Sequence, residues 1–329
     1  MTGGPVPQPP IPTGYDRINR YTRIIVDEAL GRGIDVEIGD PALGELRLTL
    51  GRHTVTTFES LSELTSAVAF RRCDDKLLTR AVLARAGLAI PAGRQASFDQ
   101  ADLEFLTEYG SIVVKPARGE QGWGVTIGIT TPDELDEARH IARNYSPVVL
   151  LEEQVQGDDL RAVIIGGELV AAAVRRPATV TGDGTATVAE LVDRANQRRR
   201  ELIGAGAQIR LDEAVIRLIR AAGWEVGSVL PTGRTLVVGR TANVHTGATI
   251  EDVTAEVHPA LTELAVAATA AIGLPVAGVD LMVEAVDKPD GTIIEVNEQP
   301  GLANHEPHPT AARFVDLLFP ETARPVRPA

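Results

Sequence analysis

Two polar side chains end an apolar run near the C-terminus of the chain. The segment reads IIEVNEQPG, and it places Glu295 and Asn297 two residues apart, just before a turn at Pro300–Gly301. Alternate residues of a strand share a face, so Glu295 and Asn297 are expected to point the same way. Ile294 and Val296 are then expected to point into the core.

A second run, AGVDLMV, precedes this segment and is joined to it by the turn sequence DKPDG. A hairpin of the two runs would bring Asp280 to the same end as Glu295 and Asn297. Carboxylate and amide oxygens are the ligands that Mg²⁺ prefers, and Mg²⁺ commonly completes its octahedron with phosphate and water. The pattern therefore predicts a magnesium site. A polar strand end that binds nothing is the alternative.

A glycine-rich loop follows another apolar strand. Lys115 ends the run SIVVKP, and Gly119, Gly122 and Gly124 lie directly after it in ARGEQGWG. Glycines let backbone N–H groups approach an anion closely because they have no Cβ. The loop is not a Walker loop, since no Gly-Lys-Ser/Thr follows, and no helix begins at its last glycine as in a dinucleotide site. An ordinary hairpin loop is the alternative.

Further charged residues fit the same chemistry. Lys76 begins a predicted helix, and Glu152 and Glu153 follow the buried run PVVLL. Two lysines and a glycine loop could hold phosphates, and a carboxylate at 152 or 153 could accept hydrogen bonds from a ribose. This set is typical of an ATP-using enzyme that works by positioning and electrostatics. Read alone, Lys76 is equally a solvated lysine.

The composition narrows the class of protein. The chain has 329 residues, which suits two or three sub-domains. Its hydrophobic content of 44% allows a core of aliphatic residues, because aromatic residues make up only 4%. A formal net charge of −13 disfavours nucleic acid as a partner, since a phosphate backbone attracts a basic surface. A small anion such as ATP is not excluded.

The single cysteine, Cys73, excludes an intrachain disulfide and a multi-cysteine zinc site. Residues 1–14 lack the basic and apolar regions of a signal peptide and are expected to form a flexible tail. The most apolar stretch, Leu264–Val279, is interrupted by Gly273 and Pro275 and is too short to span a bilayer. We therefore expect a cytoplasmic protein with no membrane partner.

Helix and strand periods alternate from Tyr15 onward, which indicates an α/β or α+β fold. One helix should begin at a capping box formed by Thr131 and Glu134. Helices are predicted at 17–33, 74–87, 131–144 and 259–274, and the second of them should end at Gly87, with Pro91 just beyond. Strands are predicted at 35–40, 45–51, 111–116, 147–153, 276–286 and 292–298, with a hairpin over 159–176.

The stretch from Pro177 to about Arg240 is less regular and rich in arginine, and it is predicted to be an insertion on the rim of the fold. The arginines at 198–200 are expected to form a solvated face or to attract a carboxylate-bearing substrate. The predicted division of the chain is a tail (1–14), an N-terminal α/β and helical region (15–107), a nucleotide-binding lid sub-domain (108–156) and a C-terminal sub-domain (157–329) with a rim insertion at 182–240.

Five blocks of the sequence, in order, resemble the ATP-grasp superfamily of carboxylate–amine ligases. They are CDDKLLTRAVLARAGLAIPAG, IVVKPARGEQGWGV, LLEEQVQGDDLRAVIIGGELVAAAVRR with its continuation, SVLPTGRTLVVGRTANVHTGATIEDV and GVDLMVEAV…IIEVNEQPGL. The likeness covers about residues 60–322. The middle blocks resemble cyanophycin synthetases and glutathione-forming bifunctional ligases. The segments ESLSELTSAVAFRRCDDK and NEQPGLANHEPHPTAARFVDLLFP are more similar to N-acetylglutaminylglutamine synthetases.

The resemblance implies an α+β ATP-grasp fold, in which two α/β sub-domains grip ATP between them, with a short N-terminal α/β region. It also implies roles for single residues. Lys76 and Lys115 would contact the ATP phosphates under a flap of Gly119, Gly122 and Gly124, Glu152 would lie near the adenine, Asp159 would bind the ribose, and Asp280, Glu295 and Asn297 would hold two Mg²⁺ ions.

One position departs from some members of the superfamily. D-alanine–D-alanine ligases place an arginine two residues before the aspartate ligand, where this chain has Gly278. Another cation must then stabilise the transferred phosphoryl group. Arg161 and Arg176 are the expected catalytic residues, and they would face the acyl phosphate or the substrate carboxylate.

The resemblance places a loop over the acceptor site at NVHTG, with Asn243, His245 and Gly247 as substrate-binding residues. A structured turn without a ligand is the alternative. Gly301 is assigned to the substrate pocket because its loop directly follows the metal ligands. His305 and His308 lie in NHEPHP, where a zinc site is disfavoured because no third ligand is near in the sequence.

The implied activity is an ATP- and Mg²⁺-dependent ligation of a carboxylate and an amine through an acyl phosphate. The substrates would be amino acids or dipeptides, as in an N-acetylglutaminylglutamine synthetase. The alternatives are a cyanophycin-like or glutathione-like amino-acid ligase and an ATP-binding regulator without turnover. A homodimer is a further expectation from the resemblance.

Overall fold

The computed structural model of the chain describes residues 9–119, 122–203, 208–239 and 247–323. Substrate-binding candidates Asn243 and His245 lie outside these residues. The chain divides into two compact units. Unit 1 comprises Met1–Ile90, Arg161–Ala173 and Asp252–Ala329, and unit 2 comprises Pro91–Leu160 and Val174–Glu251. Each unit is described by itself.

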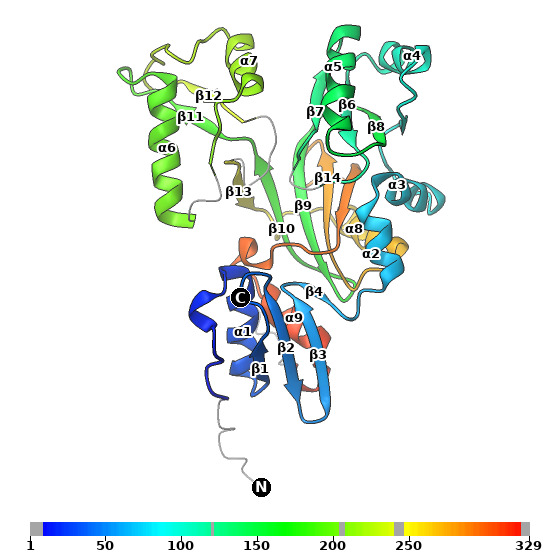
Figure 1. The fold of residues 1–329 in the computed structure, drawn as a ribbon, viewed down its shortest axis with the longest axis vertical. Helices are drawn as coiled ribbons and strands as arrows, with labels where there is room; N and C mark the ends of the chain where they lie inside the picture. Colours follow the sequence, from blue (N-terminus) through cyan, green and yellow to red (C-terminus); the bar gives the residue numbers. More distant parts are fainter. Residues whose placement is uncertain (1–8, 120–121, 204–207, 240–246, 324–329) are drawn as a thin grey trace. The chain divides into compact units, whose positions relative to one another are not determined.

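Unit 1 combines a small antiparallel sheet, the end of a larger sheet and several helices (Figure 1). Its elements are the 3₁₀ turn η1 (Tyr15–Arg17), α1 (Arg20–Gly31), β1 (Asp35–Ile38), β2 (Glu45–Leu50), β3 (His53–Phe58), β4 (Leu61–Ser62), α2 (Ala67–Asp74), α3 (Lys76–Arg85), α8 (Pro259–Ile272), β14 (Val276–Val283), β15 (Gly291–Asn297), η3 (Leu302–His305), α9 (Thr310–Leu318) and η4 (Pro320–Thr322). The boundaries between the units fall inside β9 (Asp158–Ile165) and β10 (Glu168–Arg176), so each of these strands has residues in both units.

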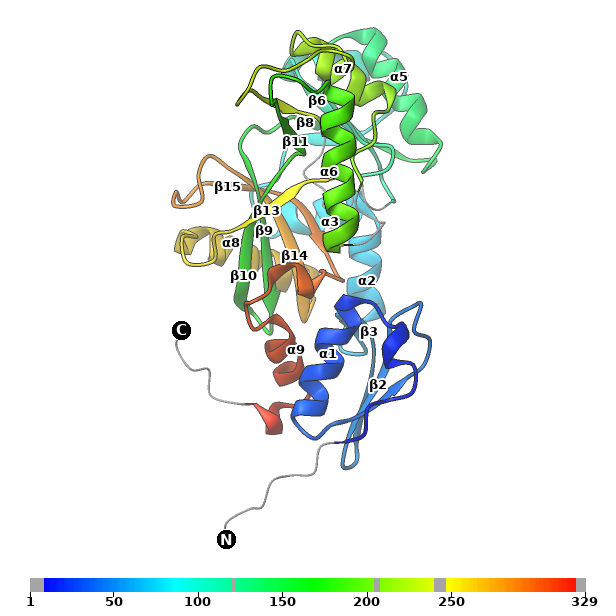
Figure 2. The ribbon, with the colours of Figure 1, turned by 90° about the vertical axis from the view of Figure 1, so that its left-hand side faces the viewer.

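The N-terminal part of unit 1 shares one core with its C-terminal part. Strands β1–β4 form an antiparallel meander, and α1 and α9 lie side by side against it (Figure 2). Buried side chains from both ends of the chain fill this core, among them Ile25, Leu46 and Phe314. Burial of such aliphatic and aromatic groups is the main source of the stability of a unit of this size.

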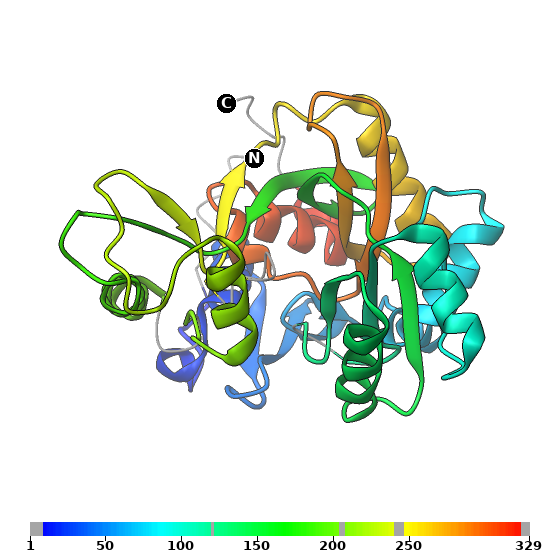
Figure 3. The same cartoon turned by 90° about the horizontal axis from the view of Figure 1, so that it is seen from above.

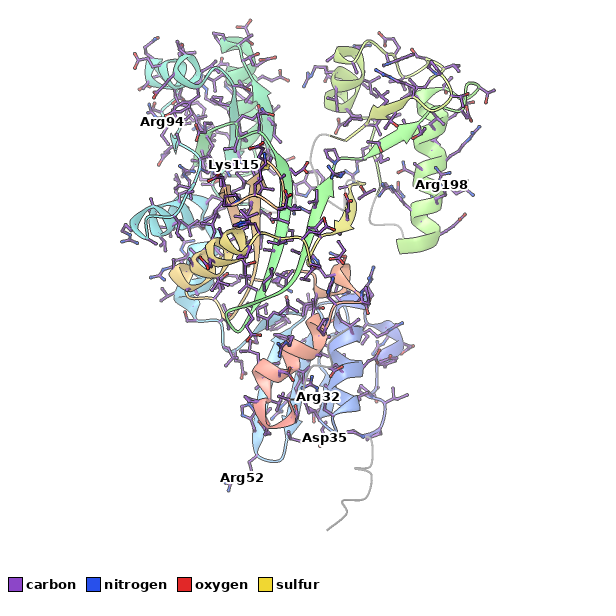
Figure 4. All side chains as sticks on the ribbon, turned by 180° about the vertical axis from the view of Figure 1, so that it is seen from behind. Arg32, Asp35, Arg52, Arg94, Lys115 and Arg198 are labelled. Atoms are coloured by element: carbon purple, nitrogen blue, oxygen red, sulfur yellow. The ribbon has the colours of Figure 1, made fainter. Side chains whose placement is uncertain are left out.

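An arginine ties the two ends of the chain together. Arg32, at the C-cap of α1, has a side chain that is only 2% exposed. It donates hydrogen bonds to Glu28 (2.7 Å), to Asp316 (2.5 Å) and to the carbonyl of Ala312 (2.8 Å) (Figure 4). Every strong donor of the guanidinium that faces the core therefore has an acceptor, as a buried charge requires.

The predicted hairpin near the C-terminus is confirmed as β14 and β15, and α8 packs along it (Figure 3). It lies at one edge of a five-stranded sheet with the order β13-β10-β9-β14-β15, in which β13 spans Thr249–Asp252. The register shifts after Asp280, so that Asp280 is opposite Glu295 and Leu281 is opposite Ile293. Ile294 is therefore the extra residue of a bulge.

The bulge corrects one detail of the sequence analysis. Ile293 is 1% exposed, whereas Ile294 is only half-buried, so the expectation that Ile294 points into the core is wrong. The expectation for Val296 is confirmed, because this side chain is 2% exposed. An inserted residue reverses the alternation of faces in a strand, and no composition signal marked it here.

Unit 2 begins with a four-stranded antiparallel sheet of the order β5-β8-β6-β7. Its helix α5 begins at a capping box, as predicted, in which Thr131 and Glu134 bond each other's backbone N–H groups. The elements of this part are β5 (Gly93–Gln95), α4 (Gln100–Tyr109), β6 (Ile112–Pro116), β7 (Thr126–Ile129), α5 (Pro132–Arg143) and β8 (Val149–Glu153).

The second part of unit 2 is more regular than the sequence suggested. The stretch expected to be irregular contains β11 (Thr179–Thr181), α6 (Val188–Ile203), α7 (Glu213–Ala221) and β12 (Thr235–Val237). Strands β11 and β12 pair, and a separate buried cluster that includes Val188, Ile219 and Leu230 forms their core. Polar residues outnumber apolar ones in α6, which hid its periodicity. Arg198 projects from this helix (Figure 4).

Among the described residues, no helix is long and apolar enough to cross a membrane.

A buried carboxylate organises the start of α4. Asp102 has no exposed surface and accepts hydrogen bonds from the N–H groups of Ser97 (3.0 Å) and Phe98 (2.8 Å) and from Arg139 of α5 (2.8 Å). Burial by itself raises the pKa of Asp102, but these hydrogen bonds outweigh it and lower the pKa below its usual value. The carboxylate therefore stabilises the fold in its charged form.

Replacing Asp102 should destabilise unit 2 strongly. Asp102→Asn leaves the buried Arg139 without its main counter-charge, and we expect a loss of about 3 kcal/mol in the free energy of unfolding, measured by urea denaturation at pH 7. Asp136→Asn is the matched control, because Asp136 also contacts Arg139 (2.5 Å) but is 61% exposed. It should cost about 0.5 kcal/mol.

The same pair predicts a pH dependence. Since the folded-state pKa of Asp102 lies below the unfolded one, its contribution is complete above the unfolded pKa and is lost as the pH falls through the folded pKa. Equal losses for the two variants at pH 7 would contradict this account of Asp102.

Candidate functional site

Two carboxylates face each other across the hairpin of unit 1. Asp280 on β14 is directly opposite Glu295 on β15, and we call them the carboxylate pair. Directly opposed residues have Cβ atoms about 5 Å apart, and like charges in such positions repel each other. Asp280 is only 5% exposed, so water screens this repulsion poorly. The pair needs nearby cations.

Arg161 of β9 supplies the first cation. Its Nε bonds Asp280 Oδ1, and its Nη2 lies 3.0 Å from Asp280 Oδ2, so the contact is bidentate. Gly278 leaves room for this arrangement. A Cβ at position 278 would lie 2.7 Å from Arg161 Nη1 and 3.3 Å from Arg161 Cδ. The Arg161 side chain thus occupies the space that a side chain at position 278 would need.

Lys76 supplies the second cation. It is the first residue of α3, whose N-terminus is capped by the side chain of Asp75. Lys76 Nζ lies 3.0 Å from Glu295 Oε1, and the lysine side chain is 14% exposed. The structure therefore brings together four residues that the sequence analysis assigned to one site: Lys76, Arg161, Asp280 and Glu295.

Asn297 lies two residues beyond Glu295 and opposite Gly278, whose carbonyl is 3.4 Å from Asn297 Nδ2. The donor oxygens at this end of the hairpin thus come from two carboxylates and one amide. This set fits Mg²⁺, which accepts one or two carboxylates and fills its other positions with phosphate and water. Within the described residues, no group of three or more His, Cys, Asp or Glu side chains could hold a metal by itself. A zinc site at His305 and His308 therefore gains no support.

Cys73 lies close enough to the carboxylates of this region for their charges to affect its thiol. Burial, together with the charges of Glu298 and Glu295, raises the pKa of its thiol to about 12. A thiol with such a pKa is inert at neutral pH. Cys73 is therefore a packing residue beside the site.

Unit 2 contains a separate ion pair between two residues assigned to the nucleotide. Lys115 on β6 and Glu152 on β8 are 6% and 3% exposed, and Lys115 Nζ contacts Glu152 Oε2 (Figure 4 labels Lys115). Glu152 is opposite Val113, so Lys115 reaches it diagonally on the same face of the sheet. A buried pair of this kind is held by the strands and not by mobile loops.

The glycine loop after Lys115 adopts a backbone that favours glycine. Gly119, Gly122 and Gly124 have φ values of 140°, 75° and 73°. A Cβ at position 124 would also lie 2.6 Å from the ring of Tyr145. The ring of Trp123 lies 6.4 Å from that of Tyr145.

The two remaining polar candidates of unit 2 lie in ion pairs next to each other in sequence. Asp159 accepts from Arg175 at 2.6 and 3.1 Å. Arg176 lies 3.2 Å from Asp158 and 3.1 Å from Glu251, and its side chain is 51% exposed. The structure does not bring Arg176 to Lys115 or Glu152, and its catalytic role stays a prediction.

The substrate-binding candidates have separate surroundings. Gly247 has a φ of 98°, and a Cβ there would lie 2.5 Å from Ile209. Gly301 has no room for a Cβ either, because Tyr21 and Asn304 are 3.0 and 2.9 Å from that position. Both glycines are thus explained by packing, and their substrate roles stay predictions.

The sequence analysis missed three residues that contact the assigned ones. Arg175 binds Asp159, Tyr21 packs on Gly301, and Ser60 donates to the carbonyl of Pro300 (2.7 Å). Arg175 stands beside Arg176, so the double arginine could have signalled it. Tyr21 and Ser60 are more than 200 residues from their partners, and no local pattern marks them.

Comparisons with known proteins point to one superfamily. Residues 235–310 match the RimK-like ATP-grasp domain family. The chain is 34% identical over 316 residues to the cyanophycin synthetase of a Nostoc species, which covers 91% of this chain and 35% of that protein. It is 31% identical over 324 residues to the glutathione biosynthesis bifunctional protein of Listeria welshimeri, which covers 93% of this chain and 42% of that protein.

A solved structure agrees with these relatives. The bifunctional glutathione synthetase from Pasteurella multocida is similar with a TM-score of 0.67 and 26% identity, over 94% of this chain and 44% of that chain. The chain thus spans between about a third and a half of the proteins that it resembles. Their fold and the domain match give the same result, and the chain therefore belongs to the ATP-grasp superfamily and carries a RimK-like ATP-grasp domain.

Proposed function

We propose that this protein is an ATP- and Mg²⁺-dependent ligase that joins a carboxylate to an amine through an acyl phosphate. The observation that carries the proposal is the carboxylate pair, Asp280 and Glu295, opposed across a hairpin and flanked by Arg161 and Lys76. Opposed carboxylates are costly in a purely structural role because they repel each other, and water screens this pair only partly, since Asp280 is buried and the Glu295 side chain is 35% exposed. They are useful where a divalent cation is bound.

Asp280, Glu295 and Asn297 would hold Mg²⁺, and two ions are the expected number. When bound, Mg²⁺ neutralises charge on the phosphate oxygens and polarises the transferred phosphoryl group. Asp280 and Glu295 would then exchange part of their contact with Arg161 and Lys76 for the metal. The two cations become available for the phosphate and for the substrate carboxylate.

The lysines would bind the phosphates. An ammonium group has three N–H donors, so Lys115 can keep Glu152 and still donate to a phosphate oxygen. Gly119, Gly122 and Gly124 would present backbone N–H groups from the loop that follows. Glu152 and Asp159 would lie near the adenine and the ribose.

The chemistry then proceeds in two displacements. An oxygen of the substrate carboxylate attacks the γ-phosphorus of ATP, the bond to the bridging oxygen breaks, and ADP leaves. The amine nitrogen then attacks the acyl carbon, the bond to the phosphate oxygen breaks, and inorganic phosphate leaves while the nitrogen loses a proton. Arg161, aided by Arg176, would stabilise the charge that develops on the acyl phosphate. The loop over the phosphates must exclude water, because water would hydrolyse this intermediate.

The proposed substrates are an N-blocked glutamine and an amino acid, as in an N-acetylglutaminylglutamine synthetase. Support comes from the segment after Asn297 and from the segment around Ser60, which resemble that family. Asn243, His245, Gly247 and Gly301 would contact the substrates. A second candidate is a ligase acting on other amino acids, which the similarity to a cyanophycin synthetase and a glutathione biosynthesis protein favours.

One experiment separates these candidates from an ATP-binding regulator. Phosphate release from ATP and Mg²⁺ is measured with N-acetyl-L-glutamine, amino acids and dipeptides as acids and the twenty amino acids as amines, and the products are weighed by mass spectrometry. Release that needs both an acid and an amine, with a new amide mass, supports the ligase and identifies its substrates. ATP binding without release for any pair would contradict it.

The proposal includes a cytoplasmic location, where ATP is available, and a homodimer. Light scattering of the purified chain tests the oligomeric state.

Glu295→Ala should abolish Mg²⁺-dependent turnover while the chain stays folded. The substitution removes half of the carboxylate pair, and we expect phosphate release to fall by at least about 100-fold. Glu284→Ala is the control, because Glu284 directly follows β14 of the same hairpin but its side chain is 74% exposed. Unchanged ATP consumption in Glu295→Ala would contradict the assignment of Glu295 as a metal ligand.

Lys115→Met should separate stability from nucleotide binding. Loss of the ammonium leaves Glu152 buried without its main counter-charge, so we expect about 3 kcal/mol of destabilisation and a strongly raised KM for ATP. The double variant Lys115→Met/Glu152→Gln removes both charges and should regain most of the stability, measured by urea denaturation. Recovery of the ATP KM as well would show that Lys115 does not bind phosphate.

Gly278→Ala should act through Arg161. The added Cβ falls 2.7 Å from Arg161 Nη1, so the guanidinium must leave Asp280, and turnover should fall about tenfold or more. In a protein that already carries Arg161→Ala, Gly278→Ala should lower turnover little further. The initial rates of the wild type, the two single variants and the double variant measure this. Gly31→Ala is the control, since no atom lies within 4 Å of its added Cβ. Full activity of Gly278→Ala would show that the contact between Arg161 and Asp280 is not needed for the reaction.

A further inference from the structure

The loop Gln299–Glu306 continues directly from the strand that carries Glu295 and Asn297, and we call it the distal loop. Residues far away in the sequence hold it. Gln299 Nε2 donates to the carbonyl of Phe58 at 3.0 Å, and Ser60 Oγ donates to the carbonyl of Pro300 at 2.7 Å. Both partners come from the N-terminal meander, more than 200 residues upstream. The first turn of the loop is thus fixed to a sheet edge.

Helix α1 holds the rest of the distal loop. Tyr21 OH donates to Asn304 Oδ1 at 3.0 Å, and Arg20 Nη2 donates to the carbonyl of Ala303. Arg20 also lies 3.3 Å from Glu306. Contacts from the N-terminal region thus reach both ends of the distal loop, and two of them, at the carbonyls of Pro300 and Ala303, hold its backbone.

The fit between Tyr21 and Gly301 is close. A Cβ on Gly301 would lie 3.0 Å from Tyr21 Cε1 and 2.9 Å from Asn304 Nδ2, so a larger residue here would force these two side chains to shift. Ser60 is 2% exposed, and its hydroxyl therefore bonds Pro300 in a place that water does not reach. Tyr21 and Ser60 are the two contacts that a single-atom change can remove without leaving a large cavity.

We infer that Tyr21 and Ser60 are positioning residues for the amine substrate, and that they act by fixing the distal loop. The inference rests on the proposed function and deepens it. The distal loop follows Asn297 with no intervening element. It also lies beside the end of the hairpin that carries the metal ligands, because a Cβ on Gly278, opposite Asn297, would lie 3.1 Å from Pro300 Cβ. A substrate held beside the metal ligands is therefore close to this loop. Attack by the amine requires the nitrogen within about 3.5 Å of the acyl carbon, and a loop displaced by 1 Å misplaces it.

The effect should be confined to the second displacement. Phosphoryl transfer to the carboxylate depends on the lysines, the metal ligands and Arg161, and none of these contacts Tyr21 or Ser60 among the interactions described above. Hydroxylamine separates the two steps. It is small enough to capture an acyl phosphate without an amino-acid binding site, and it yields a hydroxamate and phosphate.

The test compares two reactions of the same variants. The first is hydroxamate formation from ATP, Mg²⁺, the acid identified by the panel above and hydroxylamine. The second is amide formation with the amino acid that the same panel identifies. Tyr21→Phe and Ser60→Ala should leave hydroxamate formation within twofold of the wild type and raise the KM of the amino acid about tenfold, the factor for one lost hydrogen bond.

Tyr15→Phe is the matched control. Tyr15 is in the same N-terminal region, and its hydroxyl donates to Asp27 at 2.6 Å instead of to the distal loop. It should leave both reactions unchanged. Tyr21→Phe combined with Asn304→Ala should cost no more than the Asn304 change alone, because both remove the same hydrogen bond.

The outcomes are distinguishable. A normal KM for the amino acid in Tyr21→Phe and Ser60→Ala, with the wild type active in both reactions, overturns the inference alone. An equal loss of hydroxamate and amide formation also overturns it, because the residues would then support the whole unit. Wild-type protein that forms no hydroxamate with any acid overturns the proposed function and, with it, the inference.

Discussion

The electrostatic repulsion between Asp280 and Glu295 is the constraint on which the site depends. Their opposed register on β14 and β15 places two negative charges about one strand spacing apart, and Asp280 is largely closed to water. Arg161 and Lys76 come from two other elements to balance them. Strand β9 and helix α3 must therefore lie at fixed positions next to the hairpin, and Gly278 must stay small.

Unit 2 also contains buried charges, but there they form a pair of opposite sign. The Lys115–Glu152 pair is neutral as a whole, and it is buried between two strands of one sheet. Removing both charges from a buried pair is commonly cheap, whereas removing one is expensive. The ammonium of this pair lies on the strand that leads into the glycine loop, and this placement agrees with a role in anion binding.

The sequence was informative where local patterns decide the structure. The capping box at Thr131, the glycine end of the helix that begins at Lys76, and the hairpin of β14 and β15 all follow from short-range rules, and the structure agrees with them. The hairpin also predicted that Asp280 lies at the same end as Glu295 and Asn297, whereas the direct opposition of Asp280 and Glu295 depends on the bulge. The candidates Lys76, Arg161, Asp280 and Glu295 could therefore be named from types and spacing together with the resemblance.

Long-range packing decided what the sequence could not show. The bulge at Ile294 depends on how β15 fits the rest of its sheet, and the alternation of residues gives no sign of it. The helix α6 was hidden by its many polar residues, because its apolar positions are buried against a small local core. The grip of Tyr21 and Ser60 on the distal loop joins residues from opposite ends of the chain. Only the folded topology brings them together.

The core that α1 shares with α9 has a consequence for the order of events during synthesis. Arg32 has no contact with Asp316 or the carbonyl of Ala312 until those residues have been synthesised. The core of the meander likewise lacks Phe314 until then. Unit 2 lies wholly between these segments in the chain, so all of its residues leave the ribosome before unit 1 can close. During that interval the N-terminal meander exposes apolar surface that nothing yet covers. The apolar side chains that Phe314 covers in the folded chain therefore stay exposed until α9 has been made.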